Sequence, residues 1–270
     1  MAEIAARNSF LLPVATLWWR ELVRFFRQRS RVLGMAAAPV LFWLFMGSGL
    51  GSSFHSASAP AGSGYLQYFF PGTVVMVVLF TSILSSMSVI EDRHEGFLQS
   101  VLVAPIDRSS LVLGKVLGGT TLAVLPGFLF LLLSPVVGFS LHFGQLIWMA
   151  GVLFLIAFGL TSLGFFVAWK MDSTQGFHAI LNLVLLPMWL LSGALFPSSG
   201  ASTWVRWVML LNPLTYGLAA LRRLLSGPSV TFAADVAPLA TSIEITVFSC
   251  VLAIAAALIW TGRPTVKNLV

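Results

Sequence analysis

The sequence predicts an all-α integral membrane protein with six transmembrane helices. Two long stretches contain no Asp, Glu, Lys or Arg: 59 residues from Val32 to Ile90, and 54 residues from Val116 to Trp169. Hydrophobic residues make up 58% of the chain and charged residues 9%, whereas soluble domains are about a quarter charged. A charge at the centre of a spanning helix costs at least about 2.5–3.5 kcal/mol, so this composition is typical of a protein in a bilayer.

The N-terminal segment, residues 1–31, predicts a cytoplasmic end with an amphipathic helix lying in the membrane interface. Arginines recur there at intervals of three and four residues and share one helix face, while Trp18 and Phe25 belong to an apolar face beside it. In the simpler interpretation this helix is only a positive anchor, and in the functional one it transmits movement from a cytoplasmic partner. The arginines of the stripe are Arg20, Arg24, Arg27 and Arg31.

The apolar runs of residues 32–263 predict a single transmembrane domain, and a chain of 270 residues has room for about six spans of about 20 residues each. A β-barrel is excluded because its strands would alternate apolar and polar residues. The segment 197–230 is cationic and interrupted by prolines, so we expect one or two short re-entrant or interfacial helices there, on the outer side. Residues 264–270 form a cytoplasmic tail. The predicted spans are about 33–51, 69–90, 116–138, 146–169, 177–196 and 239–261.

The distribution of cations predicts that both termini lie in the cytoplasm. In this orientation 12 of the 15 Lys and Arg residues are on the inner side, and only Arg206, Arg222 and Arg223 are outside. The formal charge of +6 therefore matches the anionic inner leaflet of a membrane. No recognisable nucleic-acid fold accompanies the cations, so membrane lipid is an expected partner and nucleic acid is not.

The sequence lacks the residue patterns of enzymes and metal sites. The four histidines have no metal-ligand spacing, Cys250 is the only cysteine, and no GxSxG or GxxxxGK[ST] motif occurs. Glu244 is the one acid in an apolar stretch; we expect it at the outer interface, with a proton or substrate role as the alternative. We therefore predict no enzyme activity, no metal site and no cofactor bound by this chain, so that energy for active transport comes from another chain.

The only charge-dense segment between spans, residues 91–115, predicts a short amphipathic helix displayed to the cytoplasm. Charges at its start are followed by apolar residues at helical spacing, and Pro105 ends the helix. Such a helix suits a groove on a soluble partner, and a lipid-facing loop helix is the alternative. The candidate coupling residues are Glu91, Asp92, Arg93, Glu95, Phe97, Leu98, Leu102, Pro105 and Arg108.

The run EDRHEGFLQSVLVAPIDRSSLVLGK resembles the cytoplasmic loop of permease subunits in type-2 ABC exporters, with Gln99 as a departure where Glu or Arg is common. The stretch 190–222 resembles the same family's section between its fifth and sixth spans. The resemblance covers almost the whole chain and is strongest to the drug-exporter and nodulation-factor-exporter branch. Positions that carry it are Asp92, Arg93, Gly96, Leu98, Leu102, Pro105, Arg108, Leu111, Gly114, Lys115, Ser192, Gly193, Phe196, Pro197, Asn212, Pro213 and Tyr216.

The resemblance implies a homodimeric permease in the plasma membrane, the inner membrane of a bacterium. Two separate ABC ATPase subunits would bind ATP and Mg and dock on the coupling segment. The implied cargo is an amphiphilic small molecule or drug. A lipid-linked polysaccharide or other lipidic cargo is one alternative, and a stand-alone channel or secondary carrier is an alternative of another class.

In that family the second and fifth spans line the transport path. Small polar residues there are candidates for substrate contact, although such residues more often serve close helix packing. The candidates are Thr81, Ser85, Ser88 and Asn182.

Overall fold

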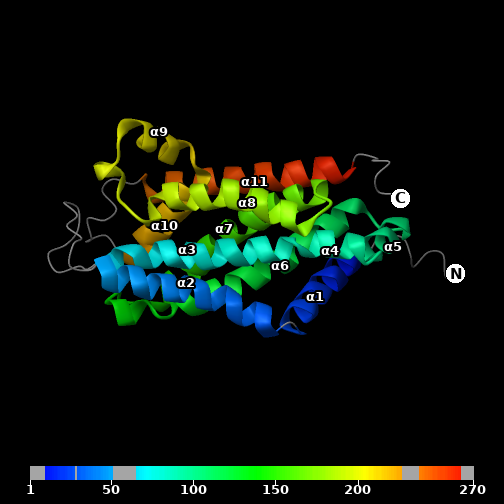
Figure 1. The fold of residues 1–270 in the computed structure, drawn as a ribbon, viewed down its shortest axis with the longest axis horizontal. Coiled ribbons are helices and arrows are strands. Elements are labelled where there is room, and N and C mark those ends of the chain that lie inside the picture. The colour runs from blue at the N-terminus through cyan, green and yellow to red at the C-terminus, as the bar shows by residue number, and fades with distance from the viewer. Residues whose placement is uncertain (1–9, 28, 51–64, 227–236, 263–270) are drawn as a thin grey trace.

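The computed structural model describes residues 10–27, 29–50, 65–226 and 237–262. Every regular element among these residues is a helix, and the long helices run side by side as a bundle (Figure 1). The described helices are α1 (Leu11–Arg27), α2 (Arg29–Leu50), α3 (Tyr65–Ser86), α4 (Ser88–His94), α5 (Phe97–Val103), α6 (Arg108–Leu131), η1 (Ser134–Val137), α7 (Phe143–Lys170), α8 (Thr174–Trp189), η2 (Leu190–Ala194), η3 (Ser198–Gly200), α9 (Thr203–Leu211), α10 (Pro213–Ser226) and α11 (Leu239–Gly262).

Five helical segments are long and apolar enough to cross a membrane, which confirms an all-helical chain with several candidate spans. The predicted first span corresponds to α2, whose described apolar part, Pro39–Gly49, is shorter than a full span. In Figure 1, α2 runs beside α3 over most of its length. The sixth span and the cytoplasmic termini stay predictions. The five segments are Tyr65–His94, Arg108–Leu131, Phe143–Lys170, Thr174–Ala194 and Leu239–Gly262.

The helix ends around the charged segment differ from the predicted span ends. The chain stays helical from α3 through α4 to His94, so the first charges belong to the end of that helix and not to a loop. After Pro105, α6 begins at Arg108, where Asp107 has the extended backbone typical of an N-cap position. Lys115 therefore lies in the second turn of a long apolar helix.

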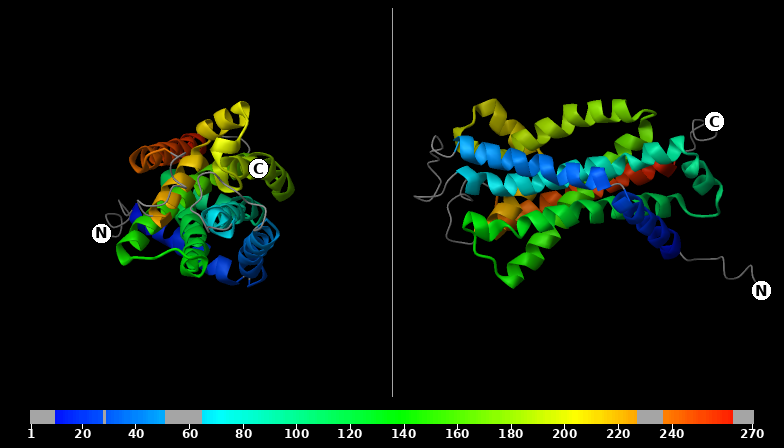
Figure 2. Two further views of the ribbon diagram at one scale, coloured as in Figure 1. Left: turned by 90° about the vertical axis from the view of Figure 1, so that its left-hand side faces the viewer. Right: turned by 60° about the horizontal axis from the view of Figure 1, so that its bottom comes forward.

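Helix α3 forms the centre of the bundle, and nearly all of its side chains are buried against α2, α6 and α7. Helix α1 lies obliquely to the bundle axis and packs on α6 (Figures 1 and 2). Two glycines one turn apart allow this close approach. A Cβ atom on Gly114 would lie 2.7 Å from Leu17 Cβ, and one on Gly118 would lie 2.8 Å from Glu21 Cβ. Small residues at such spacing let helix backbones meet closely in membranes.

The segment after the candidate span Thr174–Ala194 contains the helices α9 and α10, at the end of the bundle opposite α5 (Figure 1). Helix α10 packs among α7, α11 and η2, and most of its residues are buried. Helix α9 leaves Trp204 and Trp207 exposed. A re-entrant or interfacial position for these helices stays a prediction.

Replacing Gly114 or Gly118 by Ala should separate α1 from α6 and lower stability by about 1–3 kcal/mol, because the added methyl group overfills the contact. Gly151→Ala on α7 is the matched control, since a Cβ atom there meets nothing within 4 Å. The measurement is the midpoint of thermal unfolding of each purified variant in detergent. Equal midpoints for all three variants would contradict close packing of α1 on α6.

Candidate functional site

Asp92 on α4 is a fully buried carboxylate, with 0% of its surface exposed, that binds cations from two other helices. Arg20 on α1 donates to its two oxygens at 3.0 and 2.9 Å, a bidentate arrangement. Arg24, one turn further along α1, and Lys115 on α6 also donate to it. One carboxylate therefore joins α1, α4 and α6.

Three further acids complete a group that we call the Asp92 cluster. Glu21, which is 4% exposed, accepts a hydrogen bond from Lys115 Nζ at 2.6 Å. Arg24 donates to Glu91 at 3.1 Å and to Glu95 at 2.8 Å. A buried charge is tolerated only when opposite charges and hydrogen bonds compensate it. The members of the cluster are Arg20, Glu21, Arg24, Glu91, Asp92, Glu95 and Lys115.

The cluster favours the charged form of Arg24 and extends to α5. Burial alone would lower the pKa of Arg24, but the surrounding carboxylates, that of Asp92 foremost, raise the pKa above its ordinary value. The guanidinium carbon of Arg20 also lies 3.5 Å from the centre of the Phe97 ring, a cation–π contact. Helix α1 therefore holds both α4 and the start of α5.

Helix α5 turns its apolar face toward the bundle. Gly96, with φ of +75°, is in the left-handed region that glycine adopts readily, and it redirects the chain between α4 and α5. Leu98 is 3% exposed in the core, and Phe97 and Leu102 pack against the same core. The face predicted for a soluble partner is therefore occupied by this chain. The side chains that α5 leaves exposed are Gln99, Ser100 and Val103.

Two arginines of the charged segment bind the carboxyl ends of spanning helices. Arg93 donates to the backbone oxygens of Trp169 and Met171, both at 2.7 Å, at the end of α7. Arg108 donates to the Thr261 oxygen at 3.1 Å, at the end of α11. The last carbonyl groups of a helix lack partners within the helix and carry its negative dipole end, so a cation there is favourable.

The other predicted basic and turn residues are Pro105, Arg27 and Arg31. Pro105 is exposed in the turn between α5 and α6. Arg27 is exposed in the last turn of α1, outside the Asp92 cluster. The side chain of Arg31 lies outside the described residues.

Two of the predicted pathway residues, Ser85 and Ser88, line one small cavity, whereas Asn182 does not line it. Thr81 is fully buried and donates to the Val77 oxygen at 2.8 Å within α3. Ser85 is buried at the contact of α3 with α6, and Ser88 accepts a hydrogen bond from Lys115 at 3.2 Å. Asn182 lies on the exposed face of α8.

A family model for "ABC-2 type transporter" matches residues 13–225. The chain belongs to the ABC-2 type transporter family. It is 30% identical over 228 residues to the putative transport permease ycf38 of Cyanophora paradoxa, covering 84% of this chain and 78% of the relative. It is 23% identical to the daunorubicin resistance ABC transporter permease protein DrrB1 of Streptomyces coeruleorubidus, covering 83% and 79%. It is 25% identical to nodulation protein J of Neorhizobium galegae, covering 83% and 86%.

The family assignment confirms the resemblance seen in the sequence, and two of the three relatives are named as permeases. Sequence analysis did not single out two members of the Asp92 cluster as site residues, Glu21 and Lys115. A signal for each was present. Glu21 falls among the apolar residues of the buried α1 face, next to Leu22, and Lys115 stands directly before 54 uncharged residues. Charges on otherwise apolar faces are buried only when they have partners.

In this ABC-2 family member, Asp92→Asn should lower stability by about 3–5 kcal/mol, because it leaves buried cations without their shared carboxylate. The matched control is Asp172→Asn, since the Asp172 carboxylate is 64% exposed and lies 3.5 Å from Arg93. An exposed pair of this kind contributes at most about 1 kcal/mol. Thermal unfolding in detergent measures both, and hydrogen exchange of α1 reports its release. Similar midpoints for the two variants would contradict the structural role of the cluster.

Proposed function

We propose that this chain is the membrane-spanning permease subunit of an ATP-driven exporter. Two copies of the chain form the transport path, and two copies of a separate ABC ATPase bind ATP and Mg and perform the hydrolysis. Membership of the ABC-2 family supports the transport role. Among the described residues no cluster of His, Cys, Asp and Glu suits a metal ion.

The ATPase docks at the end of the bundle where α1, α4 and α5 meet. The observation that carries this proposal is the Asp92 cluster, because it ties α4 and, through Arg20 on Phe97, the start of α5 to helices that enter the membrane. Arg93 and Arg108 extend these ties to the ends of α7 and α11. A push on α5 therefore reaches several spanning helices through charged contacts and not through a loose loop.

This end of the bundle faces the cytoplasm of a cell whose plasma membrane holds the protein. The first turns of α1, the last turn of α11 and α5 lie at the same end in Figure 1. Most of the cations among the described residues belong to segments at that end, as the positive-inside rule expects.

The cargo is an amphiphilic small molecule. One relative is named for daunorubicin resistance and another is named as a nodulation protein. A lipid-linked polysaccharide or other lipidic cargo is the alternative, and stimulation of ATP hydrolysis in the reconstituted complex by each candidate separates the two. A stand-alone channel or carrier would instead move solute in vesicles without any ATPase, and that result would overturn the proposal.

Val103→Asp should weaken binding of the ATPase by roughly tenfold or more, since truncation or charge at the centre of an interface commonly costs over 1 kcal/mol. Val103 is 84% exposed on α5, so the change leaves the core intact. The matched control is Val136→Asp, because Val136 is 81% exposed in η1, which follows the end of α6 that lies away from α5.

The measurement is co-purification of the ATPase with tagged permease in mild detergent, followed by an ATP hydrolysis assay of the complex. Binding is expected for the unchanged chain and for Val136→Asp. Full binding and transport by the Val103→Asp variant would exclude the tip of α5 as the docking surface.

A further inference from the structure

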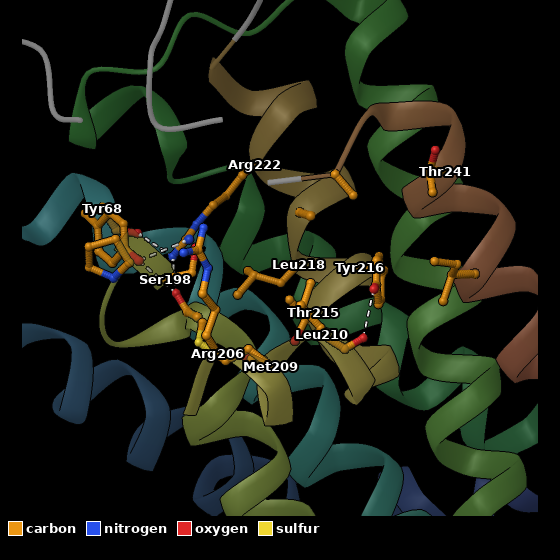
Figure 3. A pocket seen from close by; sticks show the side chains of 16 residues that line it. Tyr68, Ser198, Arg206, Met209, Leu210, Thr215, Tyr216, Leu218, Arg222 and Thr241 are labelled. Atoms are coloured by element: carbon orange, nitrogen blue, oxygen red, sulfur yellow. Dashed lines mark hydrogen bonds between the residues drawn. The ribbon is translucent and has the colours of Figure 1, made fainter. Parts of the chain in front are cut away.

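A second polar site lies at the end of the bundle opposite α5, in a pocket of about 340 Å³. Its walls come from the start of α3, from η2, from α9 and α10, and from the start of α11 (Figure 3). Most of its lining is apolar, including Met209, Leu218 and Ile245. Two arginines, Arg206 and Arg222, also line it.

Arg222 is a buried cation without a carboxylate partner among the described residues. It is 5% exposed on α10 and donates to Tyr68 Oη at 3.2 Å and to the Gly193 oxygen at 2.7 Å. Its guanidinium carbon lies 4.2 Å from the centre of the Tyr68 ring. Its Nε is buried and has no hydrogen-bond partner. A buried charge compensated only by neutral groups is costly, so the site favours an anion.

A second cation and an unused hydroxyl group face the same space. Arg206 on α9 makes no hydrogen bond or ion pair with the described residues, and Figure 3 shows its side chain extending toward the part of the pocket where Tyr68 and Ser198 lie. Thr215 Oγ1 is buried without a partner. Guanidinium groups bind carboxylate and phosphate through paired hydrogen bonds, so two of them lining one pocket suit an oxyanion.

Two exposed tryptophans stand on the helix that carries Arg206. Trp204 and Trp207 on α9 are 66% and 65% exposed. Exposed tryptophans of membrane proteins gather where the acyl chains meet the headgroups. A nearly apolar groove lies along the following turns of α11, between Thr246 and Ala256, and is also lined by α7 and α10.

We propose that this pocket binds the phosphate of a lipid-like amphiphile through Arg222 and Arg206. The apolar lining residues Met209, Leu218 and Ile245, here called the apolar wall, contact the tail. The ligand is either a membrane phospholipid or a cargo with the same chemistry. This binding does not depend on the ATPase, so it can be tested on the permease alone. It also explains why these two cations occur at the end of the bundle where the positive-inside rule expects few.

The test titrates purified permease in neutral detergent with phosphatidylglycerol, with zwitterionic phosphatidylcholine and with inorganic phosphate, and follows the thermal midpoint and bound lipid by native mass spectrometry. We expect tight, saturable binding of phosphatidylglycerol, weaker binding of phosphatidylcholine, and no effect of inorganic phosphate at the same concentration. Equal effects of all three would overturn the proposal, and binding of inorganic phosphate as tight as that of the lipid would overturn the role of the apolar wall.

Arg206→Gln and Arg222→Gln should each weaken phosphatidylglycerol binding by about tenfold or more, because each removes a charge-assisted contact. Arg223→Gln is the matched control. It removes the same charge from the next position of α10, where Arg223 donates to the Ala237 oxygen at 2.9 Å and does not line the pocket. If Arg222→Gln fails to fold, Arg206→Gln is the deciding variant, because the Arg206 side chain makes no hydrogen bond or ion pair with the described residues. Equal affinity of Arg206→Gln and Arg223→Gln would overturn the proposal.

Discussion

The buried carboxylate of Asp92 is the constraint on which the α5 end of the bundle depends. Its negative charge is stable only while Arg20, Arg24 and Lys115 surround it, and those cations come from two other helices. Helix α1 is therefore a fixed part of the bundle, anchored by charges as well as by its packing on α6. The docking role proposed for α5 follows from the same contacts, since Arg20 also covers the Phe97 ring.

Arginines have different partners at the two ends of the bundle. At the α5 end each cation of the cluster faces carboxylates, so the network is closed and acts as structure. At the other end Arg222 contacts a phenol, a ring face and backbone oxygens, and its Nε stays unpaired. A closed network resists change, whereas an incomplete one gains free energy from a ligand. A structural contact and a binding site therefore differ in whether carboxylates balance the charge of the arginine.

Hydropathy predicted the membrane helices because the bilayer acts on each segment separately and leaves its mark in local composition. The charged segment was also predictable, from its place between apolar runs and from its resemblance to a family pattern. The side that α5 turns inward was not, because an amphipathic pattern shows an apolar face without showing what covers it, and Leu98 is covered by this chain's own core. Pairing of Glu21 with Lys115 was hidden for another reason: 94 positions of sequence separate them.

Helix α7 runs without interruption from Phe143 to Lys170. Its 28 residues span about 42 Å. Arg93 holds its carboxyl end, and Ile156, halfway along it, packs against α10, where a Cβ atom on Gly217 would lie only 2.8 Å from it. Helix α10, which Ile156 contacts, also carries Arg222. One unbroken helix thereby connects the α5 end of the bundle to the wall of the far pocket.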